Sequence, residues 1–167
     1  LTEVPKIKAI EPAKMDALNL YAYIEMALHN IIAMTQNTQA TIYNEIDEDV
    51  YVKGIPAYLD SIILNFLTNA IKYRSKKRAP IIELKSEIED DYVVFKIKDN
   101  GLGMDMEKYG KNIFEMYKTF HFNEDAIGIG LFITKNHIES LGGKVTVTSE
   151  VDVGTTFLVY LKRAYKN

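Results

Sequence analysis

The segment Pro56–Tyr73 constrains the fold of this chain most, because it combines a broad apolar face with a polar stripe. At about 100° per residue, its apolar residues gather on one face of a helix: Leu59, Ile62, Ile63, Phe66, Leu67 and Ala70. The adjoining flank carries polar residues at positions i, i+4, i+7 and i+8: Asn65, Asn69, Lys72 and Tyr73. A second layer must cover the apolar face, so the polar stripe borders the core.

This polar stripe has two interpretations, and the segment alone leaves both open. It is either a solvated helix flank with one lysine that extends its head into water, or the wall of a binding site. Asparagine oxygens are hard ligands that suit Mg²⁺, which binds through few protein groups plus substrate phosphates. A lysine one turn further on neutralises phosphate as a point charge, and a tyrosine offers a flat face.

The rest of the chain predicts helices interleaved with mostly antiparallel strands. Residues 1–19 are interpreted as a linker plus a short edge strand, and Asn19 as the N-cap of a helix over 20–34. Pro56 suits the first turn of the next helix. Strands are predicted over 40–46, 81–88, 92–99, 144–150 and 155–161, and a further helix over 131–141 that ends at Gly142-Gly143. We expect an α+β fold, a two-layer sandwich whose mixed, mostly antiparallel sheet carries helices on one face.

Composition narrows the function classes. The 167 residues predict one domain, and 47% hydrophobic residues suffice for a core. A net charge of −3 gives no basic surplus for nucleic acid or membrane. The chain lacks cysteine, an apolar run of about 18–20 residues and a signal peptide. Because it begins at Leu1, we expect a piece of a longer protein, with residues 1–14 a linker remnant and 15–167 the domain.

A second motif, "DNGLGMD" over Asp99–Asp105, directly follows the predicted strand 92–99. The Asp99 carboxylate only accepts hydrogen bonds, and the exocyclic amine of a purine is a suitable donor. Gly101 and Gly103 lack a Cβ, so the backbone can approach a flat ring closely. The alternative is a plain Asp-Asn-Gly turn.

A third motif, "AIGIGLFITK", places Gly128 and Gly130 immediately before the predicted helix at residue 131. Backbone N–H groups at a helix N-terminus form an anion site. The alternative is a flexible loop that enters a core helix. Taken in order along the chain, the three motifs supply the parts needed to hold the metal, the base and the phosphates of a nucleotide.

The chain resembles the catalytic ATP-binding domain of sensor histidine kinases, within the GHKL ATPase family. The motifs that carry the resemblance are "NFLTNAIKY", "DNGLGM", "IFEMY" and "GIGL", followed by "GGKVTVTSEVDVGTTFLVYL", and they cover nearly the whole chain. The resemblance implies a Bergerat-type ATP-binding fold, ATP and Mg²⁺ as cofactors, and a place in two-component signalling.

The resemblance also implies a role for each matching residue. Asn69 would bind Mg²⁺ and Asp99 the adenine amine. The other nucleotide-binding candidates are Asn65, Lys72, Tyr73, Gly101, Gly103, Met104, Gly128, Gly130, the N–H of Leu131, and Thr155 or Thr156, of which Thr156 is our choice. The catalytic candidates are Asn65, Lys72 and Lys118.

The chain departs from the family pattern near the segment that would close over the phosphates, about residues 118–127. Ala126 stands where the family has a glycine, Tyr117 where it has phenylalanine, and Thr119 where an arginine often occurs, with Lys118 beside it. The aromatic residues Phe120, His121 and Phe122 either pack this lid shut or dock a partner, and packing is our interpretation.

None of the three histidines is an evident phosphoacceptor, and we interpret His29 and His137 as surface residues. We therefore expect a monomeric, cytoplasmic ATP-binding domain that gives the γ-phosphoryl group to a histidine on absent dimerisation helices. A response regulator would act downstream, and membrane attachment of the parent is left open. The alternatives are a degenerate nucleotide-binding or docking module and a GHKL ATPase that hydrolyses ATP. Relatives of the hydrolysing type carry a glutamate at the place of Asn65, and an amide cannot take a proton from water.

Overall fold

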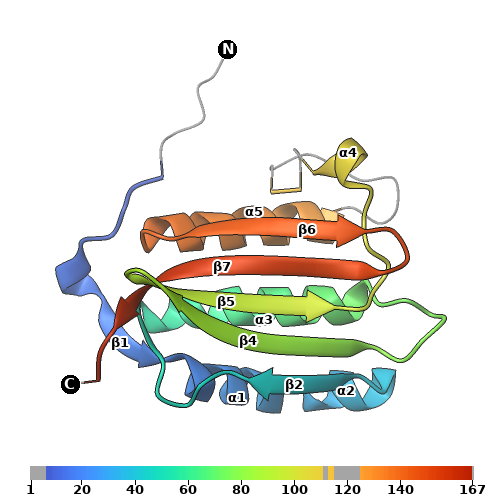
Figure 1. Ribbon diagram of the computed structural model, residues 1–167, viewed down its shortest axis with the longest axis horizontal. Helices are drawn as coiled ribbons and strands as arrows, with labels where there is room; N and C mark the ends of the chain where they lie inside the picture. Colours follow the sequence, from blue (N-terminus) through green and yellow to red (C-terminus); the bar gives the residue numbers. More distant parts are fainter. Residues whose placement is uncertain (1–6, 111–112, 115–124, 167) are drawn as a thin grey trace.

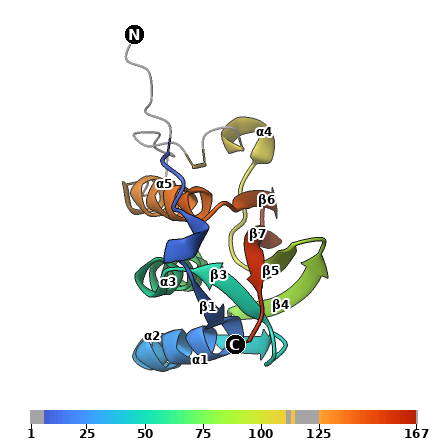
Figure 2. The same ribbon diagram turned by 90° about the vertical axis from the view of Figure 1, so that its left-hand side faces the viewer.

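The computed structural model describes residues 7–110, 113–114 and 125–166, with residues 125–130 described as helix backbone only. Four helices pack on one face of the sheet (Figures 1 and 2): α1 (Leu20–Asn30), α2 (Ile32–Thr38), α3 (Pro56–Lys72) and α5 (Asp125–Ser140). Two shorter helices are η1 (Pro12–Lys14), which precedes β1, and α4 (Met106–Tyr109), which follows β5 and contacts β6. The predicted α+β fold with helices on one face of the sheet is confirmed.

The sheet of the described residues has seven strands: β1 (Asp16–Asn19), β2 (Thr41–Glu45), β3 (Tyr51–Gly54), β4 (Ile81–Glu89), β5 (Tyr92–Asp99), β6 (Lys144–Glu150) and β7 (Gly154–Ala164). Their order is β1-β3-β7-β5-β4-β2, and β6 also pairs with β7. The β2–β4 pair is parallel and the other pairs are antiparallel, so the sheet is mixed, as predicted. Strand β7 is central because β5 pairs with one of its edges, and β6 and β3 with the other.

Helix α3 forms the centre of the core, as its periodicity predicts. Its buried residues are Leu59, Ile62, Ile63, Phe66, Leu67, Ala70 and Ile71. They face the sheet, where the ring centroid of Phe66 lies 4.8 Å from that of Phe157 on β7. Burial of aliphatic and aromatic side chains of this size is the main favourable term in folding. The same helix therefore fixes the position of its polar flank relative to the ends of β5 and β7.

The ends of the first helical region differ slightly from the prediction. The Asn19 side chain caps α1 as predicted, because its Oδ1 accepts a hydrogen bond of 2.8 Å from the backbone N–H of Ala22. The predicted helix over 20–34 is divided into α1 and α2 at Ile31, which leaves helical geometry (φ −107°, ψ 17°) while its side chain is buried. The predicted edge strand before Leu20 is β1, which pairs with β3.

A larger difference concerns the glycine motif before the last long helix. Helix α5 begins at Asp125 and not at Leu131, so Gly128 and Gly130 lie within its first two turns. The prediction that both glycines precede the helix is therefore wrong. Glycine costs about 1 kcal/mol relative to alanine in a helix, and tertiary context can override a cost of this size.

The N-terminal segment contacts the domain before β1 begins. The backbone N–H of Ile10 donates a hydrogen bond of 2.8 Å to the carbonyl of Ser140, at the end of α5. The short helix η1 then leads into β1. A domain boundary at residue 14 stays a prediction.

Replacement of a core isoleucine on α3 should destabilise the domain strongly. Ile63 is fully buried, so Ile63→Ala is expected to lower the free energy of unfolding by about 2–5 kcal/mol. Ile88→Ala is the matched control, because 45% of Ile88 is exposed near the end of β4, and it should cost less than about 1 kcal/mol. Urea unfolding of both variants measures the difference. Equal losses would contradict the central place of α3 in the core.

Candidate functional site

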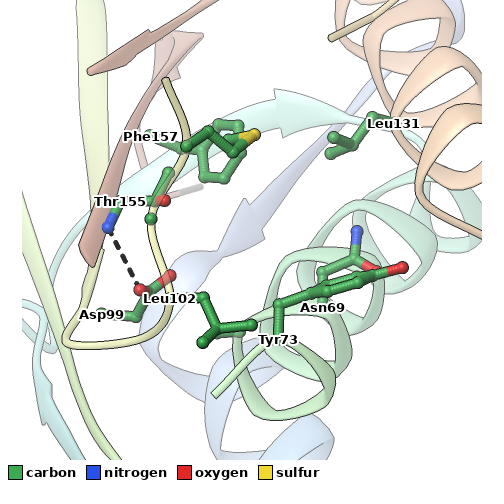
Figure 3. Close-up of a pocket in the computed structure, with 10 residues that line it drawn as sticks. Asn69, Tyr73, Asp99, Leu102, Leu131, Thr155 and Phe157 are labelled. Atoms are coloured by element: carbon green, nitrogen blue, oxygen red, sulfur yellow. Dashed lines mark hydrogen bonds between the residues drawn. The ribbon is translucent and has the colours of Figure 1, made fainter. Parts of the chain in front are cut away.

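A pocket opens between the C-terminal half of α3 and the ends of β5 and β7 (Figure 3). Its wall consists of Asn69, Ala70, Tyr73, Asp99, Leu102, Gly103, Met104, Leu131, Thr155 and Phe157. Asp99 and Thr155 lie on one side, whereas Asn69 and Tyr73 lie on the other. The pocket thus brings together three motifs that are far apart in the sequence.

Asp99, the last residue of β5, is held by one of its two carboxylate oxygens. Its Oδ1 accepts hydrogen bonds from the backbone N–H groups of Gly101 (2.9 Å) and Thr155 (3.1 Å). Its Oδ2 has no hydrogen-bond partner among the residues that the structure describes. The carboxyl group is therefore fixed in place while one acceptor remains free for a donor in the pocket.

The surroundings of Asp99 disfavour the charged form of its carboxyl group. Burial raises the pKa of Asp99 above the ordinary aspartate value. The two backbone N–H donors and the positive charge of Arg78 act in the opposite direction, but burial is the larger effect. A buried carboxyl group with a perturbed pKa at the edge of a pocket is typical of functional sites.

Two glycines allow the loop after β5 to lie close to its neighbours. At Gly101, a Cβ would lie 2.7 Å from the carbonyl oxygen of Tyr73 and 3.1 Å from Oδ1 of Asp99. Gly103 has a φ of +67°, and a Cβ there would collide with the carbonyl of Glu150. Gly103 lines the pocket, and the predicted close approach of either glycine to a flat ring stays a prediction.

Backbone hydrogen bonds connect the same loop to α3 and to the turn between β6 and β7. The N–H of Leu102 donates to the carbonyl of Tyr73 (3.0 Å), and the N–H of Asp152 donates to the carbonyl of Leu102 (2.8 Å). The N–H of Met104 donates to Oγ of Ser149 (2.8 Å). The side of the pocket that carries Asp99 is therefore assembled largely from backbone contacts, which leave little trace in the sequence.

Asn69 carries an unsatisfied polar atom. Its side chain extends from α3 into the pocket wall (Figure 3), and its Nδ2 is buried without a hydrogen-bond partner among the described residues. A buried polar group without a partner costs about 1–3 kcal/mol, so its presence in a pocket wall favours a ligand that interacts with this amide. Rotation of the amide by 180° can present either its oxygen or its nitrogen.

Asn65 and Lys72 lie in an adjoining groove and not in the pocket wall. The groove runs between α2 and α3 and shares Asn69 with the pocket; it is lined by Met34, Thr38, Asn65, Thr68, Asn69, Ile71, Lys72 and Arg74. Asn65 Nδ2 donates a hydrogen bond of 2.9 Å to Oγ1 of Thr134, which ties α3 to α5. Lys72 is exposed, and its Nζ lies 5.5 Å from the ring centroid of Tyr73.

Other predicted site residues fall in different places. Thr155 lines the pocket, whereas Thr156 lies on the opposite face of β7, because successive strand residues alternate. Thr156 is therefore not part of this wall, and its contact with a nucleotide stays a prediction. Leu131 is buried in the wall from α5. Lys118 lies outside the described residues, as do Tyr117, Thr119, Phe120, His121 and Phe122.

The sequence prediction missed three apolar residues of the wall: Ala70, Leu102 and Phe157. Strand parity could have found Phe157, since it shares the pocket face of β7 with Thr155. Leu102 stands inside the motif "DNGLGM", but 41% of it is exposed, which its residue type does not suggest.

The histidines give one confirmed and one wrong prediction. His29 is exposed on α1, as predicted. His137 is half-buried and stacks on Tyr58 with ring centroids 4.4 Å apart. Its Nδ1 is buried without a partner in the described part of the chain, and burial lowers the pKa of His137. The surface interpretation of His137 is therefore wrong.

The described residues contain no group of three or more His, Cys, Asp or Glu side chains that could hold a metal ion by itself. None of their helices combines the length and the apolar character needed to cross a bilayer.

The chain is similar in sequence to a family of known proteins. The profile of the family described as histidine kinase-, DNA gyrase B-, and HSP90-like ATPase matches residues 54–165. Cyanobacterial phytochrome A from Nostoc sp. is 32% identical over 136 residues, which are 80% of this chain and 17% of that protein. The methanogenesis regulatory histidine kinase FilI from Methanothrix harundinacea is 34% identical over 99 residues, which are 59% of this chain and 11% of that protein. The chain thus spans less than a fifth of these relatives.

Solved structures share the fold. The nucleotide-free catalytic domain of histidine kinase ThkA superposes with a TM-score of 0.77 at 20% identity, and covers 90% of this chain and 98% of that one. Full-length ShkA in complex with AMPPNP gives a TM-score of 0.78 at 22% identity, over 95% of this chain and 33% of that one.

Replacement of Asp99 by asparagine should change how stability depends on pH. The native state holds the Asp99 proton to a higher pH than the unfolded chain does, because burial raises the pKa of this group. Asp99 therefore contributes a loss of stability as the pH rises from about 3.9 through the native pKa. In Asp99→Asn this loss is absent, while the amide oxygen can still accept from Gly101 and Thr155.

We expect the stability of Asp99→Asn relative to wild type to increase from acid to neutral pH in urea unfolding experiments. Asp60→Asn, at an exposed position on α3, serves as the control and should show no such trend. A difference between Asp99→Asn and wild type that stays constant with pH would show that burial does not perturb Asp99.

Proposed function

Because the chain belongs to the family of histidine kinase-, DNA gyrase B- and HSP90-like ATPases, with the histidine kinase type of catalytic domain, we propose that it binds ATP in the pocket beside α3. We further propose that it supplies the γ-phosphoryl group to a histidine on another domain of its parent protein. The single observation that carries the first step is the Asp99 carboxylate, which is fixed through Oδ1 and leaves Oδ2 without a partner in the described structure.

The free oxygen of Asp99 matches the exocyclic amine of adenine, which donates hydrogen bonds. The side chains of Leu102, Met104 and Phe157 supply an apolar wall beside it, and such walls suit a flat ring. A guanine presents a carbonyl oxygen where adenine has its amine, and this oxygen would face the carboxylate unfavourably. The pocket therefore favours adenine over guanine.

The adjoining groove offers groups for the phosphates. Asn69 belongs to both the pocket and the groove, and its buried Nδ2 lacks a partner in the described structure. A 180° rotation of the amide would present Oδ1 there instead, and this oxygen fits a ligand of Mg²⁺. When bound, Mg²⁺ bridges and neutralises phosphate oxygens, and it needs few protein ligands. Lys72 and Arg74 line the groove and can offset the remaining phosphate charge.

Asn65 favours phosphoryl transfer over hydrolysis as the reaction. ATP hydrolysis requires a group that takes a proton from the attacking water, and an amide cannot do so at neutral pH. The amide nitrogen of Asn65 already donates to Thr134, which leaves the amide oxygen to face the groove. In transfer, the base that activates the acceptor histidine would come from the missing dimerisation helices, and this chain would contribute positioning and electrostatics.

The relatives extend the proposal to the parent protein. One relative, the methanogenesis regulatory histidine kinase FilI, is much longer than this chain, because the match covers 11% of it. We therefore place this domain on the cytoplasmic side of a sensor kinase, beside its dimerisation helices and upstream of a response regulator.

Binding of an ATP analogue tests the pocket. Wild type is expected to bind AMPPNP in calorimetry, more tightly with Mg²⁺ than without. Asp99→Ala should weaken binding by about 10–100-fold or more, because a hydrogen bond to a charged group is worth about 1.5–3 kcal/mol. Asn69→Ala should remove the effect of Mg²⁺ and leave binding without Mg²⁺ nearly unchanged.

Asn30→Ala is the matched control for Asn69, since Asn30 is exposed at the end of α1. It should bind like wild type in both conditions. If wild type shows no binding at any accessible nucleotide concentration, the chain is a degenerate module and the proposed function is wrong.

Transfer itself needs the acceptor domain. With radiolabelled ATP and a polypeptide that carries the parent's dimerisation helices, wild type is expected to produce an acid-labile phosphohistidine, and Asn69→Ala should produce little. Release of inorganic phosphate without labelling of the acceptor would instead favour hydrolysis.

A further inference from the structure

Arg78 lies outside the pocket but contacts both loops that form its adenine side. It belongs to the segment between α3 and β4, and its guanidinium donates to four backbone carbonyls. Nε donates to Asn100 (2.7 Å), and Nη2 lies within reach of Gly101 (2.8 Å), Asp152 (2.6 Å) and Val153 (3.4 Å). Among the described residues Arg78 forms no salt bridge. All four of its hydrogen-bond acceptors are backbone carbonyls.

The four carbonyls belong to two segments that also hold Asp99. Asn100 and Gly101 directly follow Asp99, and the N–H of Gly101 is one of the two donors to its Oδ1. Asp152 and Val153 form the turn that leads to Thr155, whose N–H is the other donor. The carboxylate joins the two segments on the pocket side, and the guanidinium joins them on the outer side.

The turn between β6 and β7 needs such support. Asp152 adopts a left-handed conformation with φ of +64°, which is uncommon for a residue with a side chain. Strained backbone of this kind persists where surrounding contacts over-determine it. Here these contacts are the bond from the Asp152 N–H to the Leu102 carbonyl and the bond from Arg78 to the Asp152 carbonyl.

We propose that Arg78 is the positioning residue of the pocket: it clamps the loop after β5 to the β6–β7 turn and thereby orients the Asp99 carboxylate toward the ligand. The identity of the ligand as an adenine nucleotide rests on the function proposed above, whereas the clamp itself does not. The planar guanidinium suits this role, because several donors lie in one rigid fork, which a lysine ammonium cannot reproduce.

Two variants separate the clamp from the charge. Arg78→Lys keeps the charge and loses the fork, and Arg78→Met loses both. Lys77→Met is the matched control, since Lys77 is the exposed neighbouring cation. In the nucleotide-free protein, amide hydrogen exchange at Gly101 and Thr155 should accelerate at least tenfold in both Arg78 variants and remain like wild type in the control.

Nucleotide affinity gives the second measurement. Both Arg78 variants should bind AMPPNP at least tenfold more weakly than wild type at neutral pH. As the pH is lowered, binding should fail earlier in Arg78→Met than in wild type, because loss of the cation raises the pKa of Asp99 further. Arg78→Lys should keep the pH midpoint of wild type.

The pH comparison isolates one group. Among the residues that the structure describes, Arg78 is the charged residue that acts on the Asp99 carboxyl group. Tyr73, the C-cap of α3, is the other titratable residue of the pocket wall. It is present in every variant, as is the titrating adenine base, so the ratio of variant to wild-type affinity cancels both contributions.

Hydrogen exchange in the free protein tests the clamp, and nucleotide binding by wild type tests the proposed function, so the two can fail separately. Wild-type exchange rates at Gly101 and Thr155 in a folded Arg78→Lys, or wild-type affinity in both variants, would overturn the positioning role. If Arg78→Met fails to fold, Arg78→Lys decides alone. If wild type binds no nucleotide, the proposed function fails, but the exchange rates of the free protein still test the clamp.

Discussion

The pocket depends on the point where β5 and β7 stop pairing through their backbones. The ladder between these strands runs to the pair Lys98–Thr156. At the next position, the N–H of Thr155 donates to the side chain of Asp99 instead of to a backbone carbonyl. The carboxylate thus continues the strand pairing by one step, and the two backbones stay close there, because a Cβ at Gly154 would collide with the carbonyl oxygen of Asp99. The pocket lies between these strand ends and α3, and the Asp99 carboxylate is part of its wall.

This arrangement places two unfavourable features in one wall. Asp99 carries a charge whose burial raises its pKa, and Asn69, across the pocket, carries a buried amide nitrogen without a partner in the described structure. Neither feature helps a free domain to fold, since each costs desolvation without full compensation. A ligand with an amine donor at one end and metal-bound phosphates at the other would relieve both. Natural proteins commonly accept such local losses of stability where they bind or react.

Sequence patterns give information on this site where the residues recur at a regular spacing, or where only one residue type allows the backbone conformation. The apolar period of α3 predicts its core face and hence the location of Asn69. The glycines of "DNGLGM" are predicted to approach a ligand ring, whereas their closest contacts in the structure are with neighbouring backbone. Thr155 was not chosen over Thr156, because a shift of one residue in a strand exchanges its two faces. Arg78 could not be recognised, since a side chain that binds backbone carbonyls of distant segments produces no pattern in either segment. The role of Lys118 stays a prediction.

The two ends of the proposed nucleotide site are held by different kinds of contact. The adenine end is built from backbone hydrogen bonds, close glycine contacts and the clamp of Arg78, all within this chain. The groove proposed for the phosphates is lined by residues of α2, α3 and the segment that follows α3, and its Asn65 is joined to α5 through the side-chain bond to Thr134. Under the proposed function, the base end would select the nucleotide with groups of this chain alone. Because the described residues of the groove include no carboxylate or histidine that could act as a general base, phosphoryl transfer would depend on how this domain meets the domain that brings the acceptor.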